Sequence, residues 1–469
     1  MTFAVAAVDL GATSGRVMLG TFTDDRVSLR EVRRFPNAPV RRTYGGRTEL
    51  RWNFGDLMEQ ITEGLREAVR QEPELSGLAV DSWGVDYGLV RSGRQVDDPF
   101  HYRDSRTAEV VEETHRRISA ARLYRRSGVQ PMAINTLYQL LDDHRTGRLA
   151  EGDSVLLMPQ LVEYALTGVA RTEATIASTT GLLGADGAWD LELARELGLP
   201  VSALPALVGA GQERVPLFAD LGRVLGSDGL TVTAVASHDT ASAVAATPLA
   251  AGDAYISCGT WGLAGVELEA PFLDEAAYRE GFTNEAGYGG RICFQRNLMG
   301  LWLLSECVRR WREQGDDQAL PQLLAAARSA AGRPVFDVDD PVFAEPGDMP
   351  RRIADWYRAR DLEPPGFPAE FVRCIVDSLA ESFAAALAAA SRLTGRPVRR
   401  IHVVGGGSRN ALLCEAIAKR SGLRVLAGPA EATALGNVLA QAAVAGRVPR
   451  EPEAVRAVAE RSADRTSFG

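Results

Sequence analysis

Two stretches of this chain, about 250 residues apart, repeat one pattern, and this repeat restricts the fold more than any other feature. Residues 3–22 (FAVAAVDLGATSGRVMLGTF) and 252–268 (GDAYISCGTWGLAGVEL) each contain a β-rich run, a polar turn with Gly and Ser or Thr, and a second β-rich run. The pattern predicts a β-hairpin with small polar residues at its tip. Its repetition predicts two related domains, which we place at residues 1–245 and 246–469. Residues 77–90 (GLAVDSWGVDYGLV) share the pattern.

Helical segments lie between these β-rich stretches, and the alternation predicts an α/β protein. Residues 401–428 predict a strand, a triple-glycine turn, a helix and another strand. The Pro-, Asp- and Gly-rich residues 330–368 predict a surface connector rather than core. Apolar spacing predicts helices over residues 56–71, 297–314 and 369–393 and a final helix at about 432–446.

Charge and composition limit the classes of function. The formal net charge of -9 argues against a nucleic-acid-binding surface, which is normally basic, so we expect a small-molecule ligand and no nucleic-acid partner. Lys419 is the only lysine, and no Gly-rich loop precedes it, which excludes a Walker-type phosphate loop. A nucleotide would therefore be bound by backbone amides, hydroxyl groups, Arg and a metal ion.

The cysteines and the apolar segments predict the compartment. The five cysteines are dispersed without CxxC spacing, which argues against a disulfide framework or a zinc site and favours a reducing cytoplasm. The N-terminus reaches Asp9 before a signal-peptide core is complete. The Ala-rich run near residues 381–395 is judged too short and too flanked by charge to span a bilayer. We expect a cytoplasmic protein without a membrane partner.

The first hairpin tip has two interpretations. Gly, Thr and Ser can turn donors towards a phosphate, and Asp9 at the strand end can hold Mg²⁺ directly or through water. The alternative is a tight hairpin in which Asp9 caps the turn, and this tip alone favours that alternative. The second tip has Gly259 and Thr260 in a similar arrangement. Cys258 beside it has no evident His base and is expected to be a buried small residue.

Three further features favour a ligand. Two tips of this kind fit a nucleoside triphosphate better than either does alone. The consecutive Gly405, Gly406 and Gly407 favour close backbone approach to a flat ligand, although a flexible turn is the simpler alternative. Asp239 lies between a predicted strand and a predicted helix, where a carboxylate could cap the helix or act as a general base. These two roles are evenly balanced by the local sequence.

Taken together, the motifs resemble those of the FGGY family of carbohydrate kinases. They run in family order from about residue 5 to about residue 437. The resemblance implies a duplicated actin-like/hexokinase-like (ribonuclease H-like) ATPase fold around a central cleft, with ATP and Mg²⁺ as cofactors. The matching segments include VDLGATSGRVML, DSWGVDYGLV, YRDSRT, LLMPQLVEYALTG, VASHDTASAV, SCGTW, NLMGLWLL and HVVGGGSRNALLC followed by GPAEATALGN.

Within the family, the resemblance is strongest to members that phosphorylate the 1-hydroxyl of L-rhamnulose. It implies that Asp239 is the proton acceptor and that Asp9 and Asp239 lie near Mg²⁺. Asp104 and Arg106 in YRDSR are second-rank candidates on the sugar side. The implied sugar-binding residues are Gly84, His238, Asp239, Thr240 and Asn297, and the implied ATP-binding residues are Ala12, Thr13, Ser14, Gly15, Arg16, Thr260 and Gly406.

The chain also departs from the family pattern. Ser305 stands where a Gln contact to ATP is expected, and Cys374 has no evident partner for the cysteine pairing of some relatives. Ser82 and Tyr87 replace the more usual Thr and Phe, and Tyr87 would add a hydroxyl near the sugar pocket.

Three other functions stay open at this point. One is a kinase of another ketose, such as L-fuculose or L-xylulose. A non-catalytic sugar sensor would not need Asp239, and a filament-forming or chaperone-like ATPase would not need the SHDT and YRDSR segments. The expected partners are the sugar and ATP, and the expected assembly is a monomer or weak homodimer.

Overall fold

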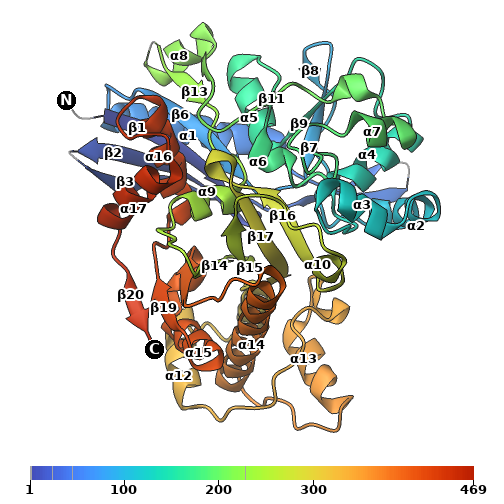
Figure 1. Cartoon of the computed structure of the whole chain (residues 1–469), viewed down its shortest axis with the longest axis vertical. Helices are drawn as coiled ribbons and strands as arrows, with labels where there is room; N and C mark the ends of the chain where they lie inside the picture. Colours follow the sequence, from blue (N-terminus) through green and yellow to red (C-terminus); the bar gives the residue numbers. More distant parts are fainter. Residues whose placement is uncertain (1–2, 24, 45, 228) are drawn as a thin grey trace. The chain divides into compact units, whose positions relative to one another are not determined.

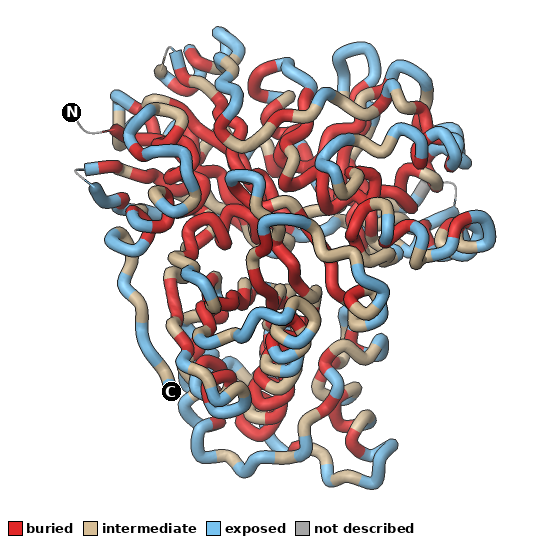
Figure 2. The backbone as a smooth tube through the Cα atoms, in the orientation of Figure 1, coloured by how far each residue is buried: buried red, intermediate tan, exposed pale blue. Residues whose placement is uncertain are grey.

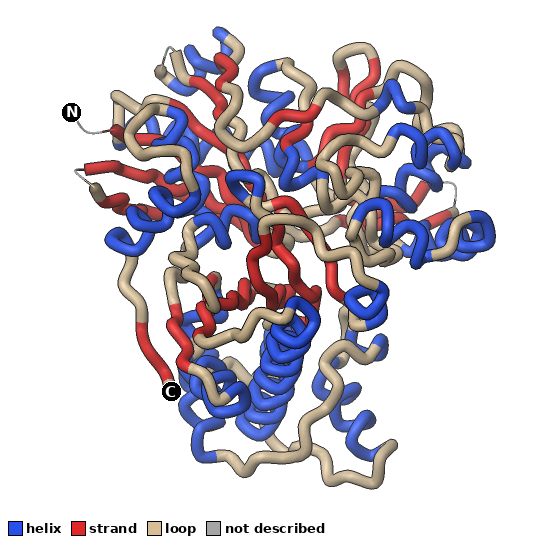
Figure 3. Tube along the Cα trace, viewed as in Figure 1, coloured by secondary structure: helices blue, strands red, loops and turns tan. Residues whose placement is uncertain are grey.

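The computed structural model describes residues 3–469 except 24, 45 and 228. Strands and helices alternate along the chain, which confirms the α/β class (Figures 1 and 3). The chain forms two compact units. Unit 1 comprises the residues up to Pro248, Glu267–Phe294 and Ala432–Ser462, and unit 2 comprises Leu249–Val266, Gln295–Glu431 and Ala463–Gly469.

Unit 1 contains a six-stranded sheet in the order β12-β13-β6-β1-β2-β3. The central strands β1 and β6 are buried along their length (Figure 2) and are apolar up to Asp9 and Asp81 near their ends, as expected for strands covered on both faces. The strands are β1 (Phe3–Leu10), β2 (Ser14–Thr23), β3 (Arg26–Pro36), β6 (Gly77–Ser82), β12 (Arg214–Pro216) and β13 (Thr231–Thr233).

Two helices cover opposite faces of this sheet. Gly64 of α1 (Phe54–Gln71) packs on Val17, and Gly20 packs on Val438 of α16 (Ala432–Val444). Val17 and Gly20 are three residues apart on β2, so their side chains face opposite ways. The sheet is therefore the middle layer of three. Helix α9 (Asp239–Ala245) packs on α16, where a Cβ on Gly436 would lie 1.9 Å from the Ser242 carbonyl oxygen.

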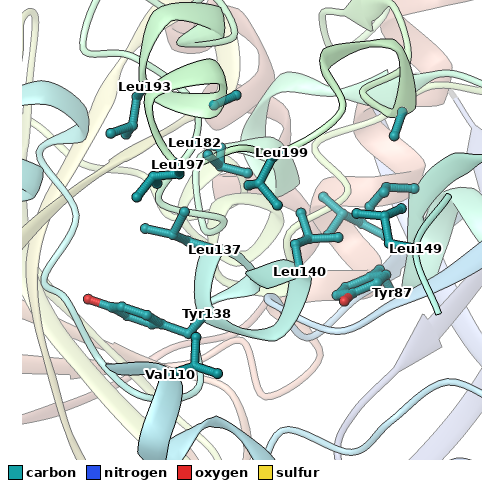
Figure 4. Packing of buried hydrophobic residues seen from close by; sticks show 14 of the residues in the cluster. Tyr87, Val110, Leu137, Tyr138, Leu140, Leu149, Leu182, Leu193, Leu197 and Leu199 are labelled. Atoms are coloured by element: carbon teal, nitrogen blue, oxygen red, sulfur yellow. The ribbon is translucent and has the colours of Figure 1, made fainter. Parts of the chain in front are cut away.

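The rest of unit 1 is a helix-rich region with three small sheets, in the orders β10-β11, β4-β5 and β8-β7-β9. Its apolar core joins α2, α4 and α7 to β7 and β9 (Figure 4). The strands are β4 (Val40–Tyr44), β5 (Arg47–Arg51), β7 (Tyr87–Arg91), β8 (Arg94–Gln95), β9 (Ser154–Leu157), β10 (Thr172–Glu173), β11 (Leu207–Val208) and β16 (Phe282–Ala286). The helices are α2 (Ala108–Arg117), α3 (Ala120–Ser127), α4 (Thr136–Arg145), α5 (Met158–Thr167), α6 (Ala174–Ala177), α7 (Leu191–Glu196), α8 (Ala219–Leu225), α10 (Glu275–Arg279) and α17 (Pro452–Ser462).

The second sheet repeats the pairing of the first. Its order is β16-β17-β15-β14-β18-β19-β20, and β15 and β17 run from one unit into the other. Strand β14 pairs antiparallel with β15 and parallel with β18, as β1 pairs with β2 and β6. The hairpins predicted at residues 3–22 and 252–268 are confirmed, whereas residues 77–90 place β6 and β7 in different sheets. The shared pairing supports the expected relation between the two domains. The strands are β14 (Asp253–Cys258), β15 (Trp261–Leu268), β17 (Ile292–Met299), β18 (Arg400–Val404), β19 (Arg424–Ala427) and β20 (Thr466–Phe468).

In unit 2, two helices, α12 and α15, pack against the long helix α14. By length and composition, α14 is the single helix of the described residues that could cross a membrane. The judgement from the sequence that the Ala-rich run in this helix is too short to span a bilayer was therefore wrong. However, 67% of its apolar window is buried inside the protein, as in a core helix. The helices are α11 (Trp302–Glu313), α12 (Leu320–Ser329), α13 (Met349–Arg358), α14 (Pro368–Thr394) and α15 (Ala411–Ser421).

Three predicted elements were wrong. The helix expected from residue 297 begins at Trp302, because residues up to Met299 belong to β17 and Gly300 lies against the Trp261 backbone. The expected connector at residues 330–368 contains α13 and a buried aromatic group around Phe336. The helix expected to be the last is followed by α17 and β20.

Candidate functional site

The tip of the first hairpin, residues 11–15, is a tight turn held from β3. Gly11 N–H donates to the Ser14 carbonyl at 3.0 Å, and the Asn37 side chain donates to the Gly11 carbonyl at 2.8 Å. A Cβ on Gly15 would lie 2.2 Å from the Phe35 ring, so only glycine fits there. Thr13 is exposed, and Ala12 and Ser14 are half-buried. The tip therefore presents Thr13 outward on a rigid backbone, and Asn37 was not predicted.

A carboxylate pair lies at the end of β1 and β6. Asp9 and Asp81 are directly opposite in the parallel register, so their side chains share one face of the sheet. Both are buried, at 4% and 0% exposure. Arg16 pairs with Asp9 at 2.6 Å, which leaves Arg16 committed to this carboxylate. Burial raises the pKa of Asp9 despite the opposing effect of Arg16, and burial followed by Asp9 raises the pKa of Asp81 well above its usual range.

Asp239 is the first residue of α9, and its side chain is 33% exposed. Its Oδ1 accepts hydrogen bonds from the N–H and hydroxyl of Thr240, at 2.6 and 3.2 Å. Burial, followed by repulsion from Asp9, raises the pKa of Asp239 to about 7, although water at the exposed third of the side chain screens both effects. The carboxylate is thus oriented, open to solvent on one side, and poised near neutral pH, as a general base requires.

Glu173 fixes the backbone before Asp239 and was not predicted. It is fully buried, and its Oε2 accepts from the Ser237 N–H at 3.0 Å and from the Thr175 hydroxyl at 2.5 Å. The same hydroxyl accepts from the N–H of His238 at 3.2 Å. Burial raises the pKa of Glu173 to about 7. A charged residue within the run TEATIAST is the signal that could have drawn attention to it.

His238 lies between two acidic side chains. Its Nδ1 is 3.3 Å from Glu285 Oε2, and its Nε2 is 3.4 Å from Asp239 Oδ1. Burial lowers the pKa of His238, and Glu285 opposes that shift. Glu285 of β16 is a third residue that the sequence analysis missed. The structure therefore brings His238, Asp239 and Thr240 together, as predicted.

Gly84 lies in a strained turn after β6. A Cβ there would lie 2.8 Å from the Thr179 side chain, and Val85 has φ of 70°, a value rare for a β-branched residue. Thr179 accepts from the Val85 N–H at 3.1 Å, and Thr136 donates to the Val85 carbonyl at 2.7 Å. Backbone strain of this kind is concentrated at ligand sites, where the surrounding structure maintains it.

Three other residues suggested for the sugar side have structural contacts instead. Tyr87 belongs to the buried cluster of Figure 4, and its hydroxyl donates to Asp143 at 2.6 Å. The expectation that this hydroxyl lies near a sugar pocket stays a prediction. The Arg106 guanidinium is buried against Asp143 and Gln139. Asp104 accepts from the backbone N–H groups of Leu50 and Arg106.

The second hairpin tip belongs to unit 2 and packs on the start of α11. Gly259 and Thr260 accept from the backbone N–H groups of Leu301 and Trp302, at 2.8 and 3.2 Å. Thr260 is half-buried. Cys258 just before it is buried, and burial raises the pKa of its thiol to about 12, which confirms that it is a structural residue.

The three consecutive glycines, Gly405, Gly406 and Gly407, occupy positions with different structural requirements. Gly405 has φ of 75°, and a Cβ on Gly407 would lie 2.5 Å from the Cys258 sulfur, so backbone conformation and packing explain these two. Gly406 has nothing within 4 Å of a Cβ and is exposed. Asn410 caps α15 by accepting from Leu413 N–H at 3.1 Å. Only Gly406 is thus left open to a ligand.

The remaining predicted residues of unit 2 are Asn297 and Ser305. Asn297 is half-buried on β17 rather than on a helix, and Ser305 is exposed on α11. All five cysteines, including Cys374, are buried free thiols.

The carboxylates of unit 1 fit a hard divalent cation. Asp9, Asp81 and Asp239 interact electrostatically with one another. Arg16 lowers the pKa of Asp9 and Asp81, and Arg34 has a smaller effect in the same direction on Asp9. Asp81 Oδ1 is buried and has no hydrogen-bond partner in the described structure. No three acidic, His or Cys side chains of the described residues converge closely enough to hold an ion by themselves. Mg²⁺ suits such a site, because it binds one or two carboxylates and keeps several waters.

Comparison with known proteins identifies the family. Residues 4–246 match the N-terminal domain of the FGGY family of carbohydrate kinases, and residues 254–445 match its C-terminal domain. The chain belongs to this family. A rhamnulokinase from Bacteroides thetaiotaomicron is 38% identical over 446 residues, covering 94% of this chain and 90% of the relative. A rhamnulokinase from Enterococcus faecalis is 36% identical over 458 residues, covering 96% and 90%.

Solved structures of several kinases share the fold. A gluconate kinase from Lactobacillus acidophilus has a TM-score of 0.78 at 15% identity, covering 100% of this chain and 94% of that structure. A xylulose kinase from the same organism has a TM-score of 0.76 at 15% identity, covering 99% and 93%. These likenesses confirm the two-domain α/β fold. The chain is therefore a sugar kinase, and sugar kinases of this family use ATP.

Proposed function

We propose that this FGGY kinase transfers the γ-phosphoryl group of ATP to the 1-hydroxyl of L-rhamnulose, giving L-rhamnulose 1-phosphate and ADP. The substrate is supported by two curated relatives named rhamnulokinase, which match nearly the whole chain at 36–38% identity. One observation carries the chemistry: Asp239 is an oriented, partly open carboxylate with a pKa of about 7 beside two buried acidic groups.

In the proposed reaction, Asp239 accepts the proton of the sugar 1-hydroxyl. The sugar oxygen then forms a bond to the γ-phosphorus, and the bond from that phosphorus to the β,γ-bridging oxygen breaks to release ADP. The Thr240 hydrogen bonds to Oδ1 hold the carboxylate in one orientation. Glu173 and Thr175 fix the preceding backbone, so that the base does not move away from the hydroxyl.

ATP is assigned to the two hairpin tips and the open glycine. Ala12, Thr13, Ser14, Gly15 and Arg16 would contact its phosphates, although Arg16 also holds Asp9. Thr260 and Gly406 would contact ATP from unit 2, and the open surroundings of Gly406 suit a flat ring.

The metal is assigned to Asp9 and Asp239, with the pairing of acidic groups described above as support. Bound there, Mg²⁺ would neutralise the charge on the phosphate oxygens. Asp9 and Asp239 would hold the ion directly or through its waters.

The sugar is assigned to the turns around Gly84 and Asp239. His238 and Thr240 flank the base, and the strained backbone at Gly84 and Val85 is held by buried hydroxyl groups. Asn297 is the proposed contact from β17.

A panel of ketoses tests the substrate. Release of ADP would be measured with L-rhamnulose, L-fuculose, L-xylulose and D-xylulose at equal ATP. We expect the highest kcat/KM for L-rhamnulose. A higher value for another ketose would overturn the substrate while retaining the kinase, and no turnover with any sugar would favour a sensor.

Several wider expectations stay predictions. The domain boundary at residues 245 and 246 can be tested by limited proteolysis. The monomeric or weakly dimeric state can be tested by analytical ultracentrifugation. The cytoplasmic location and the lack of membrane and nucleic-acid partners can be tested by cell fractionation.

A further inference from the structure

Asp81 is a buried acidic residue to which the proposed reaction gives no role. It lies opposite Asp9 in the parallel register of β1 and β6, so the two side chains share one face of the sheet. The next residue, Ser82, forms a parallel bridge with His238, which places Asp81 beside the turn that carries Asp239. The three carboxyl groups influence one another electrostatically.

One oxygen of Asp81 is firmly held. Asn437 of α16 donates from Nδ2 to Asp81 Oδ2 at 2.6 Å. Gln441 donates to Asn437 Oδ1 at 2.8 Å and to the Ala6 carbonyl at 2.9 Å, so the orientation of the Asn437 amide is fixed. Because Asn437 must present its NH₂ group to Asp81, the side chain of Asp81 is locked in position.

The other oxygen of Asp81 has no partner. Asp81 is 0% exposed, and Oδ1 accepts no hydrogen bond from the described residues. Leaving a buried polar atom unsatisfied destabilises the folded state, and more so for a charged group. The side chains of Asn437 and Gln441 fix one oxygen of Asp81, while the other is left without a partner, which points to an acceptor reserved for a ligand.

A metal-bound water satisfies these observations. No three acidic, His or Cys side chains of the described chain converge on one ion, so Asp81 is not a third direct ligand. Mg²⁺ gives up its water molecules reluctantly, and such waters are strong donors. Residues that accept from metal-bound groups orient them and strengthen binding.

We infer that Asp81 Oδ1 accepts a hydrogen bond from a water on the Mg²⁺ held by Asp9 and Asp239. The inference rests on the proposed metal site but not on the identity of the sugar. In this arrangement Asn437 is a positioning residue for Asp81, and α16 contributes to the metal site through it. Asp81 thereby adds negative charge outside the first shell of the ion.

Metal binding to the protein with ADP tests this inference without turnover. Mn²⁺ would be the probe, with its free concentration followed by electron paramagnetic resonance in wild type, Asp81→Asn and Asn437→Ser. Asp81→Asn removes the charge at constant size, and we expect it to raise the Kd for Mn²⁺ about 10–100-fold. Asn437→Ser keeps the carboxylate of Asp81 but removes the amide that holds it in position. We expect this variant to raise the Kd for Mn²⁺ several-fold.

Glu163→Gln is the matched control. Glu163 is also buried, its Oε2 pairs with Arg171 at 3.1 Å, and its Oε1 likewise has no partner in the described structure. It lies on α5 and is absent from the carboxylate group, so its variant should bind Mn²⁺ within twofold of wild type.

The possible results of the Mn²⁺ measurement distinguish between support for the inference and its rejection. A Kd for Asp81→Asn within twofold of wild type overturns the inference, and so does an equal loss in Glu163→Gln. If Asp81→Asn does not fold, the Asn437→Ser variant serves as the test. An Mn²⁺ affinity equal to that of wild type in this variant would then overturn the inference. A different preferred ketose would leave these results unaffected, so failure of the substrate proposal is distinguishable.

Discussion

Asp239→Asn should abolish most catalysis and yet stabilise the protein. The ionised Asp239 is disfavoured by burial and by Asp9, which together raise its pKa from 3.8 to about 7. The amide keeps the size of the side chain and removes the charge. A residue that is required for chemistry but unfavourable for the fold is expected at an active site.

The size of the effect follows from the pKa shift. About three units at about 1.4 kcal/mol each give about 4 kcal/mol for a fully buried group. A third of the Asp239 side chain is exposed, and solvent screening reduces this to about 1–2 kcal/mol. For a chain of 469 residues, that gain corresponds to a rise in Tm of about 1–2 °C. The loss of a general base lowers kcat about 10²–10⁴-fold.

The sign of the pH dependence is also fixed. Because the folded pKa of Asp239 lies above the unfolded value of 3.8, the folded state binds more protons between pH 3.8 and about 7. Wild-type stability therefore falls as pH rises through this window, and the difference between variant and wild type grows over the same range. It should be largest above pH 7.

The assay combines thermal unfolding at pH 5, 6, 7 and 8, without nucleotide or metal, with steady-state turnover. Asp153→Asn is the control with the opposite sign. Its carboxylate pairs with Arg91 at 2.7 Å, which lowers the pKa of Asp153, so this variant should lower Tm. A lower Tm for Asp239→Asn, or turnover within several-fold of wild type, would refute the reasoning.

Three further predictions concern the same site. The acid limb of kcat/KM should lie near pH 7, because Asp239 must be ionised to accept a proton; a pH-rate profile flat from pH 5 to 8 would contradict this. Thr175→Val removes the hydroxyl that joins Glu173 to the His238 N–H and should lower kcat about tenfold or more, whereas Thr175→Ser should retain activity; equal rates for the two would refute the positioning role. Chelation with EDTA should stop turnover and added Mg²⁺ should restore it, and undiminished activity in EDTA would exclude the metal site.

The parts of the fold that the sequence predicted correctly are those with local patterns. The hairpin tips, the strand and helix that flank the triple glycine, and the long helix near residue 380 depend on neighbours within about ten residues. Residues 297–314 were misassigned because a short apolar run suits both a strand and a helix. The close contact of Gly300 with the Trp261 backbone, which separates β17 from α11, arises only in the folded chain.

The residues of the candidate site also divide into those that local sequence patterns predicted and those that only the folded structure reveals. Asp239 and the residues beside it are found together as predicted, because they are consecutive in the chain. Glu173, Glu285 and Asn437 come from segments up to about 260 residues apart, and no local spacing links them to Asp239. Asp81 lies in a recognised segment, but its unpartnered oxygen becomes visible only when β1, β6 and α16 are packed together.

The most direct test of the central claim is phosphorus NMR of the product formed from ATP and L-rhamnulose. We predict a phosphomonoester signal split into a triplet by the two protons on carbon 1, appearing in step with ADP. Phosphate on another carbon, or release of inorganic phosphate alone, would contradict transfer to the 1-hydroxyl.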